Sequence, residues 1–129
     1  MSNIPDDLLY TADHEYVKAT ADADVVAIGI THYAQDQLGD IVFVELPKVG
    51  ATFGAHDTFG TIEAVKAVSE LFLPVAGTVV EVNGALDGDP GAINRDPYGD
   101  GWMLKLRMAD AAHKGSLLSP ADYAKHIGE

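Results

Sequence analysis

The side chain most open to chemistry is a lysine between two strand-like runs. Lys66 lies between Val65 and Ala67, in a short connection that joins the runs 58–65 and 69–74, both rich in β-branched and apolar residues. This pattern places the amine at the tip of a predicted β-hairpin, in water, where a partner can reach it. Solvated lysines are common at such tips, so the lysine by itself does not define a function.

The sequence does not support an enzyme active site. It contains no cysteine, which excludes disulfides, thiolate zinc sites and thiol nucleophiles, so any sulfur chemistry needs imported sulfur. No Gly-x-Ser-x-Gly elbow, P-loop or Gly-x-Gly-x-x-Gly fingerprint is present. The histidines show no metal-binding spacing, so no metal site is predicted and each is expected to be an ordinary surface residue: His14, His32, His56, His113 and His126. We therefore predict a protein without catalytic residues of its own.

Charge and length limit the classes of partner. The 129 residues include 20 acidic and 8 basic side chains, a net charge of −12, which would repel nucleic-acid backbones and anionic membranes. A protein partner is then expected to be basic where it docks. Apolar runs are too short to span a bilayer, and the first residues lack the pattern of a secretory or transit signal, which predicts a cytoplasmic location.

Short β-branched runs punctuated by Gly, Pro and Asn-Gly predict a mainly β chain that forms a single domain over residues 1–129. The predicted strands are 15–20, 24–30, 41–46, 58–65, 69–74, 77–82 and 101–108. In the last strand, the alternation predicts that Trp102, Leu104, Leu106 and Met108 face the core, and that Met103, Lys105 and Arg107 face water.

Two short helices have start and stop signals. Thr31 can cap a helix over 32–38 that Gly39 ends, and Ser119 can cap a helix that begins with Pro120 and stops at Gly128. Residues 110–118 could add a helical turn. Asn83-Gly84 and the stretch 87–91 are expected to be turns or loop.

The segment around Lys66 resembles the lipoyl attachment site of the glycine cleavage system H-protein family. The match is carried by Glu63-Ala64-Val65-Lys66-Ala67, then Ser69-Glu70 and Pro74-Val75-Ala76-Gly77. Further segments in the family's order extend the resemblance over nearly the whole chain: His14-Glu15-Tyr16-Val17, Gly29-Ile30-Thr31 with Leu38-Gly39-Asp40, the run 41–47, and Asn94 to Trp102. Ala64 stands where the family usually has a serine, and the loss of the serine hydroxyl is expected to alter recognition by the lipoylating enzyme.

The resemblance implies a flattened β-barrel of two sheets, a barrel-sandwich hybrid (lipoyl/biotinyl-carrier-like), with short peripheral helices. It implies lipoate in amide linkage to Lys66, in an attachment motif that includes Glu63, Val65 and Ala67. The arm would carry an aminomethyl group from glycine decarboxylase (P-protein) to aminomethyltransferase (T-protein), and dihydrolipoyl dehydrogenase (L-protein) would reoxidise it. By the same resemblance Glu15, Asp13 and Glu70 lie near a cleft that shelters the loaded arm.

Other interpretations remain open on the sequence. A biotin carrier has a similar hairpin, but its lysine usually sits between methionines. A lipoyl domain of a 2-oxo acid dehydrogenase would normally have Asp-Lys-Ala and a mobile Ala/Pro linker, which this chain lacks. An H-like protein that relays lipoyl groups to other enzymes would use the same lysine. A small hydrolase using His32 or His56 would need a pocket with perturbed carboxylates.

Overall fold

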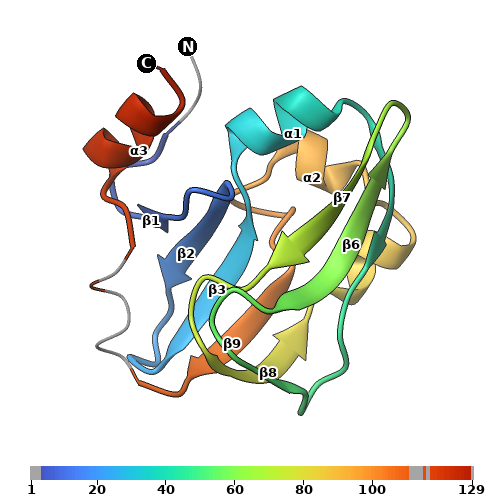
Figure 1. Ribbon diagram of the computed structural model, residues 1–129. Helices are drawn as coiled ribbons and strands as arrows, with labels where there is room; N and C mark the ends of the chain where they lie inside the picture. Colours follow the sequence, from blue (N-terminus) through green and yellow to red (C-terminus); the bar gives the residue numbers. More distant parts are fainter. Residues whose placement is uncertain (1–3, 111–114, 116, 129) are drawn as a thin grey trace.

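The described residues form two antiparallel sheets with short helices at their edges (Figure 1). The structure is a computed structural model, and it describes residues 4–110, 115 and 117–128. One sheet has the strand order β1-β2-β3-β9-β8-β5, and the other has the order β4-β6-β7. The strands are β1 (Leu9–Tyr10), β2 (Glu15–Ala19), β3 (Val25–Ile30), β4 (Ile41–Glu45), β5 (Thr52–Phe53), β6 (Thr58–Ala64), β7 (Val68–Phe72), β8 (Gly77–Val82) and β9 (Leu104–Met108).

The core lies between the two sheets. One cluster of buried side chains draws on β3 and β9 of the first sheet and on β4, β6 and β7 of the second, so the sheets close on each other over apolar residues. Ile28, Ile62, Leu71 and Leu106 are at most 1 % exposed. The two sheets do not close into a continuous barrel in the described residues, and this layered form confirms the predicted barrel-sandwich fold.

The predicted helices begin and end as their capping residues indicate. In α1 (His32–Leu38) the Thr31 hydroxyl accepts a hydrogen bond from the Ala34 amide at 3.2 Å, and Gly39, at φ +82°, ends the helix. In α3 (Pro120–His126) the Ser119 hydroxyl accepts a hydrogen bond from the Asp122 amide at 3.2 Å. Local side-chain chemistry was therefore enough to predict both.

The segment between β8 and β9 differs from the prediction. A 3-10 helix, η1 (Gly84–Asp87), and α2 (Ala92–Arg95) lie where only turns and loop were expected. Strand β9 begins at Leu104 and not at 101, because the backbone at Gly101 packs against Ala92 and Ile93 of α2. Met103 is consequently buried, contrary to the prediction that it faces water.

The remaining strand limits agree with the prediction to within two residues, and two very short strands, β1 and β5, were missed. Both pair along only two residues, too few for a periodic pattern to show. The helical turn suggested for 110–118 lies mostly outside the described residues.

The helix α3 packs against β1 through one buried tyrosine. The Tyr123 hydroxyl lies 2.7 Å from Thr31 Oγ1 and 2.9 Å from His14 Nδ1, and its ring stacks on Tyr10 with centroids 4.7 Å apart. His14 is thus half-buried and hydrogen-bonded, and the prediction of an ordinary surface histidine was wrong for it. Burial, with His126 close by, lowers the pKa of His14.

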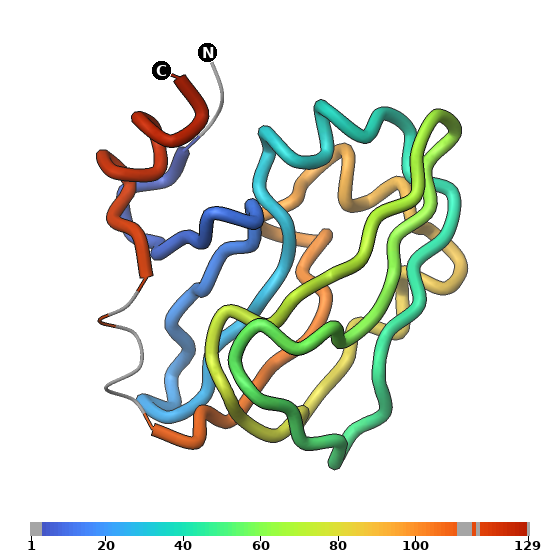
Figure 2. The backbone as a smooth tube through the Cα atoms, viewed as in Figure 1, coloured from blue at the N-terminus to red at the C-terminus, as the bar shows by residue number. Residues whose placement is uncertain are grey.

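The hairpin β6–β7 is held close to β4 by a glycine. Gly60 lies at an irregularity in the pairing of β6 with β7, and a side chain there would overlap the carbonyl oxygen of Glu45. Figure 2 shows the long hairpin with its tip beside the loop after α1.

We expect Gly60→Ala to lower the free energy of unfolding by about 3 kcal/mol or more, since backbone must move to admit the methyl group. Gly84→Ala is the matched control, because a methyl group there meets no atom within 4 Å. It should change stability by less than about 1 kcal/mol. Urea denaturation of both variants checks this, and an unchanged Gly60→Ala midpoint would contradict it.

Candidate functional site

Lys66 lies at the tip of the β6–β7 hairpin. The Ala64 amide donates to the Ala67 carbonyl at 2.8 Å, which closes a turn with Val65 and Lys66 at its two central positions. Both of these side chains are exposed. The turn therefore presents the lysine amine to solvent on a short and well-defined piece of backbone.

The inner side of the tip is attached to the end of α1. The Val65 amide donates to the Asp40 carbonyl at 2.9 Å. A Cβ built on Gly39 would lie 2.9 Å from Lys66 Cε, so the lysine stem runs along the backbone that follows α1. Glycine is favoured at this position twice over, by the positive φ and by the close approach of the lysine.

A partly buried asparagine holds this junction together. Asn94 Oδ1 accepts a hydrogen bond from the Ile41 amide, and Asn94 Nδ2 donates to the Gly39 carbonyl and to Gln35 Oε1, each at 2.9 Å. One side chain of α2 thereby joins α1, the loop after it and β4. The sequence around Asn94 resembles the family's loop, but it does not reveal the role of this residue, because its three partners are distant in the sequence.

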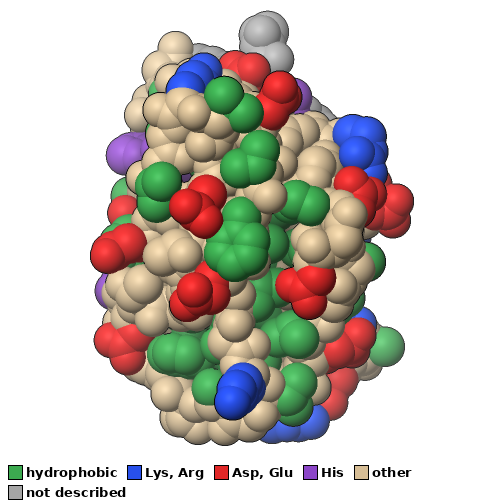
Figure 3. Space-filling model, turned by 90° about the vertical axis from the view of Figure 1, so that its right-hand side faces the viewer, with side chains coloured by type: hydrophobic (Ala, Val, Ile, Leu, Met, Phe, Trp, Pro, Cys, Tyr) green, Lys and Arg blue, Asp and Glu red, His purple; other side chains and the backbone are tan. Residues whose placement is uncertain are grey.

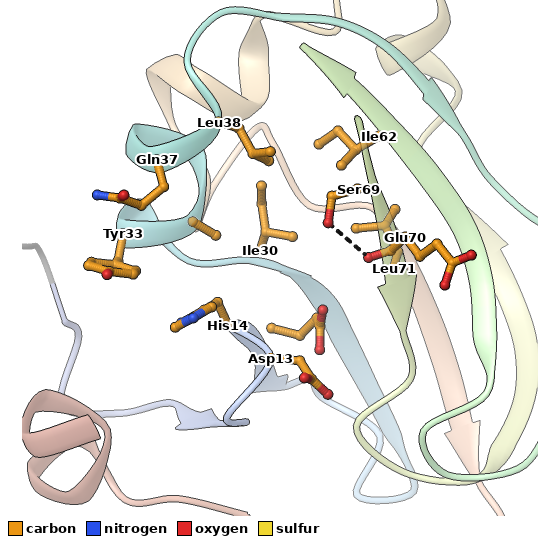
Figure 4. Close-up of a pocket in the computed structure, with 12 residues that line it drawn as sticks. Asp13, His14, Ile30, Tyr33, Gln37, Leu38, Ile62, Ser69, Glu70 and Leu71 are labelled. Atoms are coloured by element: carbon orange, nitrogen blue, oxygen red, sulfur yellow. Dashed lines mark hydrogen bonds between the residues drawn. The ribbon is translucent and has the colours of Figure 1, made fainter. Parts of the chain in front are cut away.

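A cavity of about 270 Å³ opens between α1, the start of β2 and β7 (Figure 4). Its apolar wall comes from both sheets and from the helix, and includes Ile30, Leu38, Ile62 and Leu71. Leu38 is the neighbour of Gly39, against which Lys66 packs. A chain attached to the lysine amine therefore starts close to the Leu38 side of this cavity.

Glu15 is the buried acidic group of the cavity. It is 2 % exposed, and its carboxylate accepts a hydrogen bond from the Thr11 hydroxyl at 3.0 Å. Burial is the main cause that raises the pKa of Glu15 to about 8. Hydrogen bonds with the Thr11 hydroxyl and the Phe72 backbone lower the pKa, and the nearby Asp13 carboxylate raises it further. A carboxyl group with this pKa is largely protonated near pH 7, and a cation placed beside it would favour its ionised form.

The other two predicted acids line the same cavity in different ways. Asp13 is exposed and lies at its mouth beside His14 (Figure 4). Glu70 is also exposed, and its side chain extends away from His14 and Ile30, because Ser69 and Leu71 on either side of it turn inward (Figure 4). The three acids expected near one cleft are thus brought to it, but only Glu15 is enclosed.

The attachment-motif residues flank the lysine without entering the cavity. Glu63 is exposed near the end of β6, and Val65 and Ala67 are exposed in the turn. Thr11 and Asn94 are the residues that the sequence analysis missed, and no spacing rule pointed to them. In the described residues no group of three or more His, Asp or Glu side chains could hold a metal ion, and no helix is long and apolar enough to cross a membrane.

This arrangement suits a flexible apolar chain with a polar or cationic end. The chain would start at Lys66, lie against aliphatic side chains, and bring its end to a buried carboxyl group. The apolar wall fits the hydrocarbon part of a lipoyl group, and the absence of cysteine means that any reactive sulfur must come with such a group.

Comparison with known proteins agrees with this geometry. The family model for the glycine cleavage H-protein matches residues 8–129. The chain is 56 % identical to the glycine cleavage system H protein of Chlorobaculum parvum over 98 % of this chain and 99 % of that protein. It is 55 % identical to that of Opitutus terrae over 99 % and 100 % of the two chains.

A solved structure shows the same fold. The crystal structure of a glycine cleavage system H protein from Mycobacterium marinum superposes with a TM-score of 0.89 at 42 % identity, and the match covers 98 % of this chain and 100 % of that one. The family match over almost the whole chain, the identities above 50 % and the shared fold lead to one conclusion: the chain belongs to the glycine cleavage H-protein family, the lipoyl carriers of the glycine cleavage system.

Proposed function

We propose that Lys66 carries lipoate in amide linkage and that the cavity beside it shelters the end of the arm. The observation that carries this proposal is the position of Lys66 on a hairpin tip hydrogen-bonded to Asp40, where its stem lies along Gly39, the neighbour of the cavity-lining Leu38. Exposure makes the amine available to the lipoylating enzyme, and Glu63, Val65 and Ala67 form the motif around it.

The chain acts as a carrier and leaves catalysis to its partners. When bound, the lipoyl group supplies a disulfide that takes up an aminomethyl group and is later reoxidised. The partners are the P-protein, the T-protein and the L-protein of glycine cleavage, which meet this acidic chain in the cytoplasm. The protein's own part is to present the arm at an exposed turn and to exclude water from its end.

Glu15 has the clearest task within the cavity. A cationic amine that enters beside this enclosed carboxyl group favours its ionised form, so Glu15 loses its proton and a charge-assisted hydrogen bond forms out of contact with water. Thr11 holds the carboxylate in place. Asp13, exposed at the mouth, adds a solvent-screened charge of smaller effect.

The attachment site is tested by substitution. Lys66→Arg should abolish lipoylation and carrier activity, and should leave the free energy of unfolding within about 0.5 kcal/mol of the parent, because the side chain is exposed. Lys48→Arg, at another exposed lysine, should still be lipoylated. Intact and peptide mass spectra check both variants. A lipoyl group on another lysine, or a biotinyl mass on Lys66, would contradict the proposal.

The buried carboxyl group predicts a pH dependence of stability. The pKa of Glu15 is about 8 in the folded protein, compared with an ordinary value of 4.5. Between pH 4.5 and pH 8 the folded state therefore keeps a proton that the unfolded state has released. The contribution of this proton to the free energy of unfolding is fully present below about pH 4.5 and is lost as the pH rises to about 8. The free energy of unfolding falls by a few kcal/mol at most over this range.

Glu15→Gln should remove this slope, and Glu45→Gln, at an exposed position, should keep it. Urea denaturation from pH 5 to pH 9 measures the difference. Parallel stability curves for the parent and Glu15→Gln would show that Glu15 is ionised throughout.

The role of Glu15 toward the arm predicts an order among three variants. Glu15→Gln should shorten the lifetime of the aminomethyl-loaded protein most, by roughly tenfold for one lost charge-assisted hydrogen bond. Glu70→Gln and Asp13→Asn should have smaller effects, since both side chains are exposed. Mass spectrometry of the loaded protein without T-protein measures the lifetimes. Equal lifetimes for the parent and Glu15→Gln would assign the protection to burial alone.

A further inference from the structure

The six-stranded sheet carries a hollow of about 230 Å³ that the carrier function does not use. Lys18 in β2 pairs with Ala27 in β3, and Ala27 pairs with Lys105 in β9, so the three residues form one cross-strand row and point to the same side. The small side chain of Ala27 leaves space between the two longer ones. Tyr98 and Trp102, from the loop before β9, line the same hollow. We name the hollow lined by these five residues the lysine pocket.

The lysine pocket and the cavity beside Lys66 lie on opposite sides of the sheet. Val17 pairs with Ile28 next to the Lys18–Ala27 pair, and both are buried in the core between the two sheets. Successive residues of a strand point to opposite faces, so Lys18 and Ala27 point away from that core. A ligand in the lysine pocket therefore does not compete with an arm attached to Lys66.

The charge of the lysine pocket is opposite to that of the molecule. The chain has a net charge of −12 and eight Lys and Arg side chains, two of which line this hollow. Among the described residues that line it there is no Asp or Glu. Elsewhere the surface is acidic: carboxylates are spread over the face shown in Figure 3, where lysine and arginine side chains lie mostly near the edges. A local excess of ammonium groups attracts a small anion.

The two ammonium groups together retain a positive charge. Lys18 Nζ donates to the Tyr98 carbonyl at 3.2 Å, which is a neutral partner, and the ion pairs of the described residues do not include Lys18. Lys105 Nζ lies 3.5 Å from the Glu81 carboxylate, a long contact that is open to water. Two ammonium groups and one carboxylate leave a single positive charge, which matches a carboxylate ligand better than a phosphate dianion.

The backbone of the loop does not provide a phosphate site. Phosphate sites in loops use free backbone amides that point at the anion. In the lysine pocket the Gly99 amide donates to the Asp96 carbonyl and the Trp102 amide donates to the Gly99 carbonyl, each at 3.2 Å. These amides are occupied, so the lysine side chains are the groups that can bind an anion.

The walls of the lysine pocket suit a flat apolar body. Tyr98 and Trp102 are both half-buried, and Lys105 Nζ lies 5.2 Å from the centre of the Trp102 ring, which places the ammonium group against the indole. Aromatic walls favour a ligand with a ring of its own, in offset or edge contact. The volume is smaller than that of a site for a drug-sized ligand, so the pocket suits a ligand of one ring.

Hydrogen bonds from other elements hold the aromatic walls in place. The Tyr98 hydroxyl oxygen accepts from the His32 amide at the start of α1 at 2.9 Å. Asn83 Nδ2, after β8, donates to the Trp102 carbonyl at 2.7 Å. The pocket is therefore formed before a ligand enters, which limits the conformational entropy lost on binding.

We propose that the lysine pocket binds a small carboxylate attached to one planar ring. The carboxylate lies between the Lys18 and Lys105 ammonium groups, and the ring packs over Ala27 against Trp102 and Tyr98. The site shares no residue with the attachment site or with the cavity beside Lys66, so it is independent of the proposed function.

Benzoate is the probe for this site. Trp102 is the only tryptophan of the chain, so its fluorescence reports binding in the pocket. Benzamide has the same ring without the charge, and cyclohexanecarboxylate has the charge without the planar ring. Amide chemical shifts measured by NMR locate the bound probe: those of Lys18, Ala27 and Gly99 should move, and that of Ile30 in the other cavity should not.

We expect benzoate to change the fluorescence saturably with a Kd on the order of 1 mM, as suits a one-ring ligand. Cyclohexanecarboxylate should bind roughly threefold more weakly and benzamide roughly tenfold more weakly. Lys18→Gln and Lys105→Gln should each weaken benzoate binding roughly tenfold, since each removes one charge-assisted hydrogen bond. Lys48→Gln, at another exposed lysine, should match the parent. Thermal unfolding first shows that each variant is folded.

Several outcomes would overturn the inference. A fluorescence change that does not saturate, or that is unchanged in Lys18→Gln, would show that benzoate only collides with the indole. Equal binding of benzamide would assign no role to the lysines, and tighter binding of inorganic phosphate at the same amides would assign the pocket to a phosphoryl group. Binding of a glutamate-rich peptide there without binding of benzoate would assign it to an acidic segment of a partner protein.

The lysine pocket and the proposed function can fail separately. Lipoylation of Lys66 should proceed equally in the parent, Lys18→Gln and Lys105→Gln, because neither substitution lies near the hairpin tip. Loss of benzoate binding with normal lipoylation would remove only this inference. A parent that binds benzoate but is not lipoylated at Lys66 would remove only the proposed function.

Discussion

The structure depends on one constraint: the amine of Lys66 must be exposed to solvent while the backbone that carries it is held in a defined position. A long hairpin meets the first need, since its tip has solvent on several sides. The hydrogen bond from the Val65 amide to the Asp40 carbonyl meets the second, because it joins the tip to the end of α1. Gly39 admits the lysine stem, and Asn94 holds α1, the following loop and β4 in register around this contact. Without that junction the tip would be held by the strand pairing of the hairpin alone, with no hydrogen bond to the segment after α1.

The cavity holds the carboxyl group of Glu15 among apolar side chains. An unsatisfied carboxylate at the position of Glu15 would be costly, and the protein limits that cost with the Thr11 hydroxyl, the Phe72 backbone and a raised pKa. The raised pKa keeps this enclosed carboxyl group largely protonated near neutral pH. A cation that enters can displace the proton, so the same burial that disfavours the charge alone strengthens the pair once it forms. Exposed carboxylates such as Glu45 and Glu63 differ from Glu15, because water screens their charge and they need no hydrogen bond from the protein.

The two sides of the β6–β7 hairpin therefore have different roles. Residues that point inward, such as Ile62 and Leu71, build the core and the cavity wall. Residues that point outward, such as Glu63 and Val68, form a surface next to the lysine. This division follows from the period of two in a strand, and it places Glu70 on the opposite side of β7 from its neighbours Ser69 and Leu71. A resemblance of motifs treats Glu70 and Glu15 alike, but the pleat of the strand separates them.

The sequence by itself determined whatever depends on near neighbours along the chain: the alternation of the long strands, the caps of α1 and α3, and the lysine in a turn between two strands. The order of its motifs also determined the family. Tertiary structure alone decided the burial of Glu15, the packing of Met103, the hydrogen bond of His14 to Tyr123 and the role of Asn94. Each of these depends on partners brought close by the closing of the two sheets or by the docking of a helix. The energy of a buried charge or a shared hydrogen bond is set by that enclosure, which no local pattern records.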